Sequence, residues 1–189
     1  MKTKAIVASL CAVLLVTVSV LGTMAYLTSH DAVTNTFTVG NVAITLDEAK
    51  VNPDGTVVTN ADRVKANVYH LIPGHEYTKD PVIHVDSDSE DCWLFIKLEN
   101  GLEDIIVDNT SIEAQIAANG WEIIDSTENI YAYKSIVSGG SDIAVFEEFQ
   151  LNGDAELAEY ENANITVTGY AVQADGFSTA IDAWTAANL

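Results

Sequence analysis

Clustered carboxylates are the residues of this chain whose spacing best suits a chemical role. Asp86, Asp88, Glu90 and Asp91 fall within six consecutive residues, and carboxylate oxygens are the ligands that Ca²⁺ prefers. An EF-hand-type loop would carry glycine at its sixth position and glutamate at its twelfth, where this chain has Asp91 and Lys97. We therefore expect a solvated acidic turn, with a weak calcium site as the alternative and no other metal or cofactor.

The four histidines, His30, His70, His75 and His84, do not form a recognisable zinc motif. A His-Glu-x-x-His motif places its second histidine four residues after the first, and Lys79 stands at that distance from His75. The single cysteine that follows the N-terminal apolar stretch, Cys92, opens an apolar run and is expected to be a buried small hydrophobe. We assign no catalytic residue and expect a protein that is not an enzyme, while a zinc site assembled from distant loops stays open.

Residues 1–25 have the layout of a secretory signal peptide. A start with two lysines precedes an apolar stretch over residues 5–22, and the small residues Thr23 and Ala25 suit a cut between Ala25 and Tyr26. The apolar stretch also approaches the length that spans a bilayer, so a retained membrane anchor is the competing interpretation. We expect cleavage, which predicts a signal peptidase as a partner and membrane contact only during export.

Charge and composition indicate one soluble domain after the predicted cleavage site. All 28 acidic residues follow position 25, whereas two of the eight basic ones precede it, so the mature chain has a formal charge of −22. Such a negative field argues against nucleic acid as a partner. The remaining length is enough for one domain with a core, and one cysteine cannot form an internal disulfide.

Short runs of alternating apolar and polar residues, separated by turn signals, predict mostly strands. A helix is predicted over residues 111–118, with Thr110 and Glu113 as a capping box and Gly120 as its stop. A second, C-terminal helix is predicted over residues 177–187, with Phe177, Ile181 and Trp184 at helical intervals. Few helices among many short strands indicate an all-β, antiparallel β-sandwich. The strands are expected at residues 37–46, 56–59, 64–72, 82–85, 92–98, 121–124, 130–133, 143–151 and 164–173, and residues 105–107 are ambiguous.

Three stretches carry a resemblance to a known family. They are the segment after the predicted cut (Tyr26 to Asp31, then Asn35-Thr36-Phe37-Thr38-Val39-Gly40 and Ile44-Thr45-Leu46), the segment Pro73 to Pro81, and the segment Ala171 to Phe177 followed by Ala183-Trp184. Together they resemble the TasA/camelysin proteins of bacteria, whose signal peptides are removed by a dedicated signal peptidase. The resemblance implies a jelly-roll-like sandwich and subunits that build extracellular biofilm filaments by donating an N-terminal strand. The name camelysin also implies a metallopeptidase.

The N-terminal segment of the mature chain is therefore the main functional candidate. We expect residues 1–25 to be the signal peptide, 26–35 the donor strand and 36–189 the β-sandwich, with Tyr26, Leu27, Val33 and, at the boundary, Phe37 as donor residues. An extended segment can add to an open sheet edge of the next molecule, and head-to-tail addition gives fibres of identical chains. Cleavage would free the segment.

The expected protein is thus a secreted filament subunit on the surface, or in the matrix, of a Gram-positive bacterium. A camelysin-like surface metallopeptidase and a monomeric surface adhesin or binding module remain the alternatives.

Overall fold

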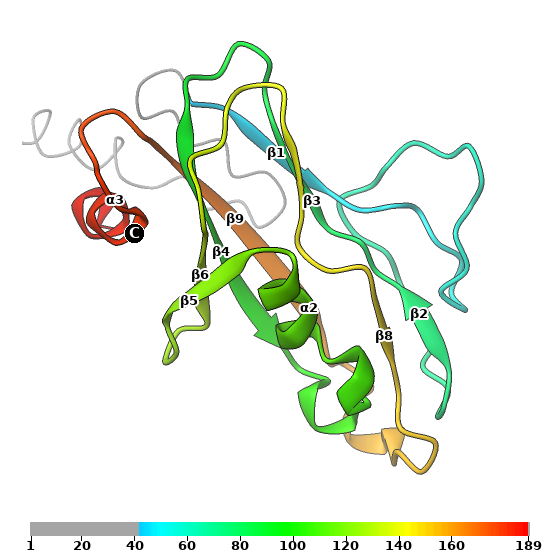
Figure 1. The fold of residues 1–189 in the computed structure, drawn as a ribbon. Coiled ribbons are helices and arrows are strands. Elements are labelled where there is room, and N and C mark those ends of the chain that lie inside the picture. The colour runs from blue at the N-terminus through cyan, green and yellow to red at the C-terminus, as the bar shows by residue number, and fades with distance from the viewer. Residues whose placement is uncertain (1–41, 189) are drawn as a thin grey trace, which may run out of the picture. The chain divides into compact units, whose positions relative to one another are not determined.

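The computed structural model describes residues 42–188 of the chain, and these residues form mostly strands (Figure 1). The strands make three antiparallel sheets, accompanied by two short α-helices, the second of them C-terminal. The all-β, antiparallel prediction is thereby confirmed. The predicted signal peptide, the cut between Ala25 and Tyr26, and the donor segment with Leu27, Val33 and Phe37 lie outside the described residues and stay predictions.

Each sheet is assembled from strands that are distant in sequence. The first has the order β1 (Ile44–Asp47), β3 (Val82–Val85), β7 (Asp142–Ala144). The second pairs β2 (Glu76–Thr78) with β8 (Glu148–Gln150), and the third has the order β5 (Trp121–Asp125), β6 (Ile130–Tyr133), β4 (Cys92–Asn100), β9 (Ile165–Gln173). The helices are α2 (Ile112–Ala118) and α3 (Ala180–Ala187), with 3₁₀ turns η1 (Glu103–Ile105), η2 (Asp108–Thr110) and η3 (Leu157–Glu159).

Strand β4 organises the core because it is buried along both faces. Successive side chains of a strand point to opposite sides. Leu94 and Ile96 enter the main apolar cluster, which also takes residues from the other two sheets. Trp93 and Phe95 face a second cluster that α3 covers with Ala183 and Trp184. The sequence is therefore apolar over residues 92–98 at every position except Lys97, and the prediction of a central strand there is confirmed.

Strands 82–85 and 164–173 and the hairpin 121–133 are also confirmed. The prediction of one strand over residues 143–151 is wrong in one respect, because the chain forms β7 and β8 with a gap between them. Both pair in the same register with the segment that holds β2 and β3. The ladder breaks opposite Pro81, which has no N–H to donate.

The predicted strands 64–72 and 56–59 are absent from the described sheets. Only isolated bridges form there, between Val64 and Glu48 and between Val57 and Val51. Side chains take the place of a ladder: the Tyr77 hydroxyl accepts a hydrogen bond from the N–H of Ile72 and donates one to a second backbone group, at 2.6 and 2.9 Å. An alternating pattern needs a partner edge to become a strand, and past Val64 this segment makes a single backbone bond to another described segment, from the N–H of His70 to the carbonyl oxygen of Pro53.

Both predicted helices exist, but their details differ from the expectation. The cap of α2 is Ser111, whose hydroxyl accepts from the N–H of Ala114, and not Thr110. Thr110 instead bonds backbone groups of neighbouring segments. Helix α3 begins after Thr179, and its Ile181 is 59% exposed instead of packing on the sheet. Between residues 42 and 188, no helix is long and apolar enough to cross a membrane.

Candidate functional site: a groove between two strand edges

Strand β9 is an edge strand of the four-stranded sheet. On its outer side it presents a row of backbone N–H and C=O groups that point away from β4. The N–H of Gly101 donates to the carbonyl oxygen of Asn164, and at the far end Ala174 donates to Asp91. Hydrogen-bonded positions alternate along an antiparallel ladder, so the even-numbered residues of β9 bond to β4. The N–H and C=O groups of Ile165, Val167 and Gly169 therefore point outward, and no described residue bonds to them.

Strand β1, at the end of the three-stranded sheet, presents a second such edge. The N–H of Asp86 donates to the carbonyl oxygen of Ala43, which by the same alternation turns the backbone of Ile44 and Leu46 away from β3. The next outward position, Glu48, exchanges two 2.8 Å bonds with Val64. The carbonyl oxygen of Leu46 accepts a bond from the Lys65 ammonium. The open part of this edge is thus short and closed at one end.

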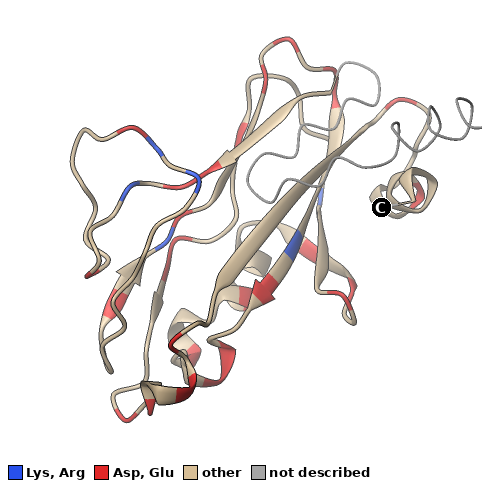
Figure 2. Ribbon diagram, turned by 180° about the vertical axis from the view of Figure 1, so that it is seen from behind, with Lys and Arg blue, Asp and Glu red and all other residues tan. Residues whose placement is uncertain are grey.

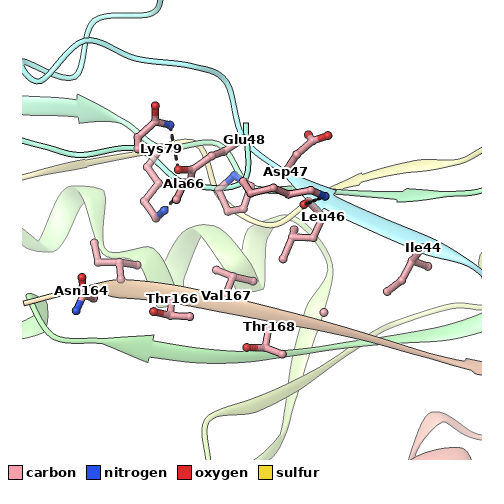
Figure 3. A pocket seen from close by; sticks show the side chains of 15 residues that line it. Ile44, Leu46, Asp47, Glu48, Ala66, Lys79, Asn164, Thr166, Val167 and Thr168 are labelled. Carbon is pink, nitrogen blue, oxygen red and sulfur yellow. Dashed lines mark hydrogen bonds and ion pairs between the residues drawn. The ribbon is translucent and has the colours of Figure 1, made fainter. Parts of the chain in front are cut away.

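These two edges border one groove with a volume of about 210 Å³. In Figure 3, Ile44 and Leu46 on β1 lie opposite Val167 and Thr168 on β9. Gly169 helps to bring the sheets together here, because a Cβ at this position would lie 3.3 Å from Cδ1 of Ile83. The groove therefore offers two strand edges and apolar side chains to an extended segment.

A second cavity of about 640 Å³ adjoins the groove. Both cavities are lined by Asn67, Lys79, Asn164 and Ile165, so they share a boundary. The lining of the second cavity is mixed, and its apolar and aromatic part includes Tyr69, Leu71, Leu102, Phe149, Leu157 and Tyr160. Its outer wall, around residues 70–72, is held by the buried Tyr77 hydroxyl. Together the cavities follow the first half of β9 and continue beyond it.

A polar cluster around the buried carboxylate of Glu48 lies where the two cavities meet. The Lys79 ammonium lies 2.6 Å from Oε2 of Glu48, and the two side chains are 12% and 5% exposed (Figure 3). Oε1 of Glu48 accepts from Nδ2 of Asn67 at 2.9 Å, and the N–H of Val51 donates to Oδ1 of Asn67 at 2.9 Å. These partners fix the orientation of the Asn67 amide, since only its oxygen can accept from Val51.

A second ionic cluster ties the three-stranded sheet together. His84 on β3 lies 2.6 Å from Asp142 on β7 and 3.0 Å from Asp47 on β1. Arg63 in turn bridges Asp47 and Asp80. Burial disfavours the charged form of His84, but the hydrogen bonds to Asp142 and Asp47 outweigh it and raise the pKa of the imidazole. Burial alone would raise the pKa of Asp47, yet its bonds from Arg63 and His84 lower it.

The basic residues that the structure describes gather near this site. Acidic residues are spread over the described chain, whereas most of the blue segments in Figure 2 lie at one side. Four of the six lysines and arginines in the described range, Lys50, Arg63, Lys65 and Lys79, lie between positions 50 and 79. Lys65 and Lys79 line the groove itself.

The acidic turn and the histidines do not converge. Asp86, Asp88, Glu90 and Asp91 are all exposed, and carbonyl oxygens of the turn approach Gly139. No group of three His, Cys, Asp or Glu residues able to hold a metal ion occurs among the described residues.

His70, His75 and His84 lie in separate surroundings. His75 bonds the carbonyl oxygen of Asp54, His84 bonds two carboxylates, and His70 contributes its carbonyl oxygen to Tyr77. His30 lies outside the described range.

Cys92 is fully buried, as predicted, and burial raises the pKa of its thiol to about 12.

Comparison of the chain with protein-family models, with curated proteins and with solved structures gives no match. The site is therefore described by its own geometry.

Sequence reasoning missed Glu48, Asn67 and Lys79. The signal available was that Glu48 continues the alternation of Val42, Ile44 and Leu46. Its position is buried only because residues 64–67 cover it.

Proposed function

We propose that this protein is a secreted structural subunit that assembles head to tail by N-terminal strand donation. The observation that carries the proposal is the groove between β1 and β9, bordered by outward backbone groups on both strands. Open sheet edges pair readily with an added strand. The two sheets that meet at this groove would form the jelly-roll-like sandwich of the TasA/camelysin type.

Residues 26–35 of a second copy are the proposed occupant. Ten extended residues span roughly 33 Å, a length comparable to that of the nine-residue β9. A strand laid along β9 would bond to the outward groups of Ile165, Val167 and Gly169, and its alternate side chains would reach the apolar residues that line part of the adjoining cavity. Tyr26, Leu27 and Val33 supply large apolar side chains for that purpose.

Donation to the next copy leaves each receiving molecule with its own donor segment free. The contact is heterologous and does not close, so it produces a filament. Removal of residues 1–25 would release the segment, which ties assembly to export and to the surface or matrix of a Gram-positive bacterium. The partners are then copies of the same chain and, during export, a signal peptidase.

The test compares chains that begin at Tyr26 with chains that begin at Thr36, by light scattering and negative-stain electron microscopy. We expect filaments from the first and folded monomers from the second. Filaments of equal length from both chains would refute the role of residues 26–35.

A matched pair of variants tests the groove itself. Val167→Lys places a charge in the groove, whereas Ile123→Lys places one on β5, the strand at the opposite end of the same sheet. Only Val167→Lys should stop assembly, and equal effects of both would refute the groove as the acceptor. A chain from Tyr26 that stays monomeric in every condition would favour the adhesin or the metallopeptidase, which zinc content and chelator-sensitive casein cleavage would separate.

A further inference from the structure

The cluster of Glu48, Asn67 and Lys79 brings an amine and a carboxamide to one buried carboxylate, which are the groups that amide formation needs. Glu48 binds the lysine amine through one carboxylate oxygen at 2.6 Å and the asparagine amide nitrogen through the other at 2.9 Å. One carboxylate therefore holds a nucleophile and a leaving group side by side. We propose that Lys79 and Asn67 become joined by an intramolecular isopeptide bond, with Glu48 as the catalytic acid and base. This inference does not depend on filament assembly.

The reaction requires a neutral lysine amine, and the Glu48 carboxylate is placed to take the proton that Nζ must lose. Glu48 is 4% exposed as a residue and the Lys79 side chain 12% exposed. Separated charges are costly where water is excluded. Transfer of one proton from the Lys79 ammonium to the Glu48 carboxylate replaces two buried charges with two neutral groups, and it leaves a lone pair on Nζ for attack.

The asparagine is positioned as the electrophile. The backbone N–H of Val51 donates to Oδ1 of Asn67 at 2.9 Å, which polarises the carbonyl and would stabilise negative charge on that oxygen during reaction. Nδ2 is bonded to the carbonyl oxygen of Ala49 and to Glu48. These bonds hold the amide plane fixed while the long, flexible lysine side chain swings from Oε2 toward Cγ.

The reaction balances without an external reagent. Nζ of Lys79 attacks Cγ of Asn67, a C–N bond forms, and the carbonyl electron pair moves to Oδ1. Glu48 gives its proton to Nδ2 and takes one from Nζ. The Cγ–Nδ2 bond then breaks and ammonia leaves. Glu48 ends as a neutral carboxylic acid beside the new amide, so no unpaired charge remains buried.

Alternatives in the same groove have different surroundings. Lys65 also lines the groove, but its ammonium donates to the backbone carbonyl oxygen of Leu46. No carboxylate in the described part of the chain bonds to this ammonium to take its proton. Asn164 donates to the carbonyl oxygen of Asn162. Among the described residues, Lys79 and Asn67 are the pair that shares one buried carboxylate.

Tryptic peptide mapping of the denatured wild-type protein tests the proposal, since trypsin cuts after free lysine and not after an acylated one. We expect residues 66–97 to appear as one peptide, uncut at Lys79 and lighter than its sequence by one ammonia molecule. Separate peptides 66–79 and 80–97 of full mass would overturn the proposal. Loss of ammonia with Lys79 still cleaved would indicate a cyclised asparagine and would also overturn it.

Three variants assign the roles. Lys79→Arg and Glu48→Gln should restore the full mass, and Glu48→Gln should also restore cleavage at Lys79. The matched control Lys65→Arg should keep the cross-link. A cross-link that forms at wild-type yield in Glu48→Gln would refute the role of Glu48.

Discussion

Removal of a single oxygen atom from Tyr77 tests whether the outer wall of the cavity that adjoins the groove is held as the structure indicates. Tyr77 is fully buried, and its ring stacks on Phe149 with centroids 5.1 Å apart. Its hydroxyl accepts from the N–H of Ile72 and donates to the carbonyl oxygen of His70. Burial raises the pKa of this hydroxyl, so it stays protonated and able to do both. Tyr77→Phe keeps the ring and removes both bonds.

The expected cost follows from those two bonds. A buried hydrogen bond contributes roughly 1 kcal/mol, and a buried group left unpaired costs about 1–3 kcal/mol. His70 and Ile72 are exposed enough for water to replace part of what is lost. We therefore expect Tyr77→Phe to lower the free energy of unfolding by about 1–2 kcal/mol, and Tm by several degrees. Exchange of the Ile72 amide hydrogen should accelerate more than exchange in β4.

Urea unfolding, followed by fluorescence of the buried tryptophans, measures the loss. The control is Tyr133→Phe, because the Tyr133 hydroxyl bonds to no described residue, and it should change stability by less than about 0.5 kcal/mol. Equal stability of Tyr77→Phe and wild type would refute the reasoning. So would an Ile72 amide that exchanges at the wild-type rate.

Three further predictions concern single residues. His84 has a raised pKa, so its stabilising contribution is complete below about pH 6.5 and is lost as pH rises through the higher folded value; urea midpoints of wild type and His84→Gln should converge at high pH. Gly55→Ala should destabilise more than Gly140→Ala: both have φ near +80°, but a Cβ at Gly55 would lie 2.8 Å from Cα of Tyr77, whereas Gly140 faces open space; thermal unfolding that ranks them equally would contradict this. Cys92 should resist a thiol reagent at pH 8 when folded and react at once in urea, because burial raises its pKa to about 12.

Strands whose local sequence pattern agrees with their tertiary environment could be predicted from the sequence. The run Cys92–Leu98 is apolar at every position except Lys97, which is typical of a strand covered on both faces, and α3 supplies the second cover. The hairpin over residues 121–133 follows from two apolar runs around a polar turn. In these places local pattern and tertiary environment agree.

The predictions of other elements were wrong because their structure depends on contacts with distant parts of the chain. Residues 64–72 alternate, yet past Val64 they meet side chains and a single backbone carbonyl, that of Pro53, and no continuous strand edge. The break between β7 and β8 comes from Pro81, which stands across the ladder and far away in sequence. Ser111 caps α2 in place of the predicted Thr110, because the Thr110 hydroxyl accepts a hydrogen bond from the N–H of Gln150, forty residues away.

The sequence by itself determined the antiparallel β class, the central strand, the two helices and the burial of Cys92. It also determined the large negative charge and the segment predicted to be donated, since these depend on composition and on local order along the chain.

Only the tertiary structure decided that β1 and β9 stand at sheet ends facing one groove, and that Asn67 and Lys79 both bond to the buried carboxylate of Glu48. Those facts depend on which distant segments pair and in which register, because the same residue is solvated or buried according to what is folded over it.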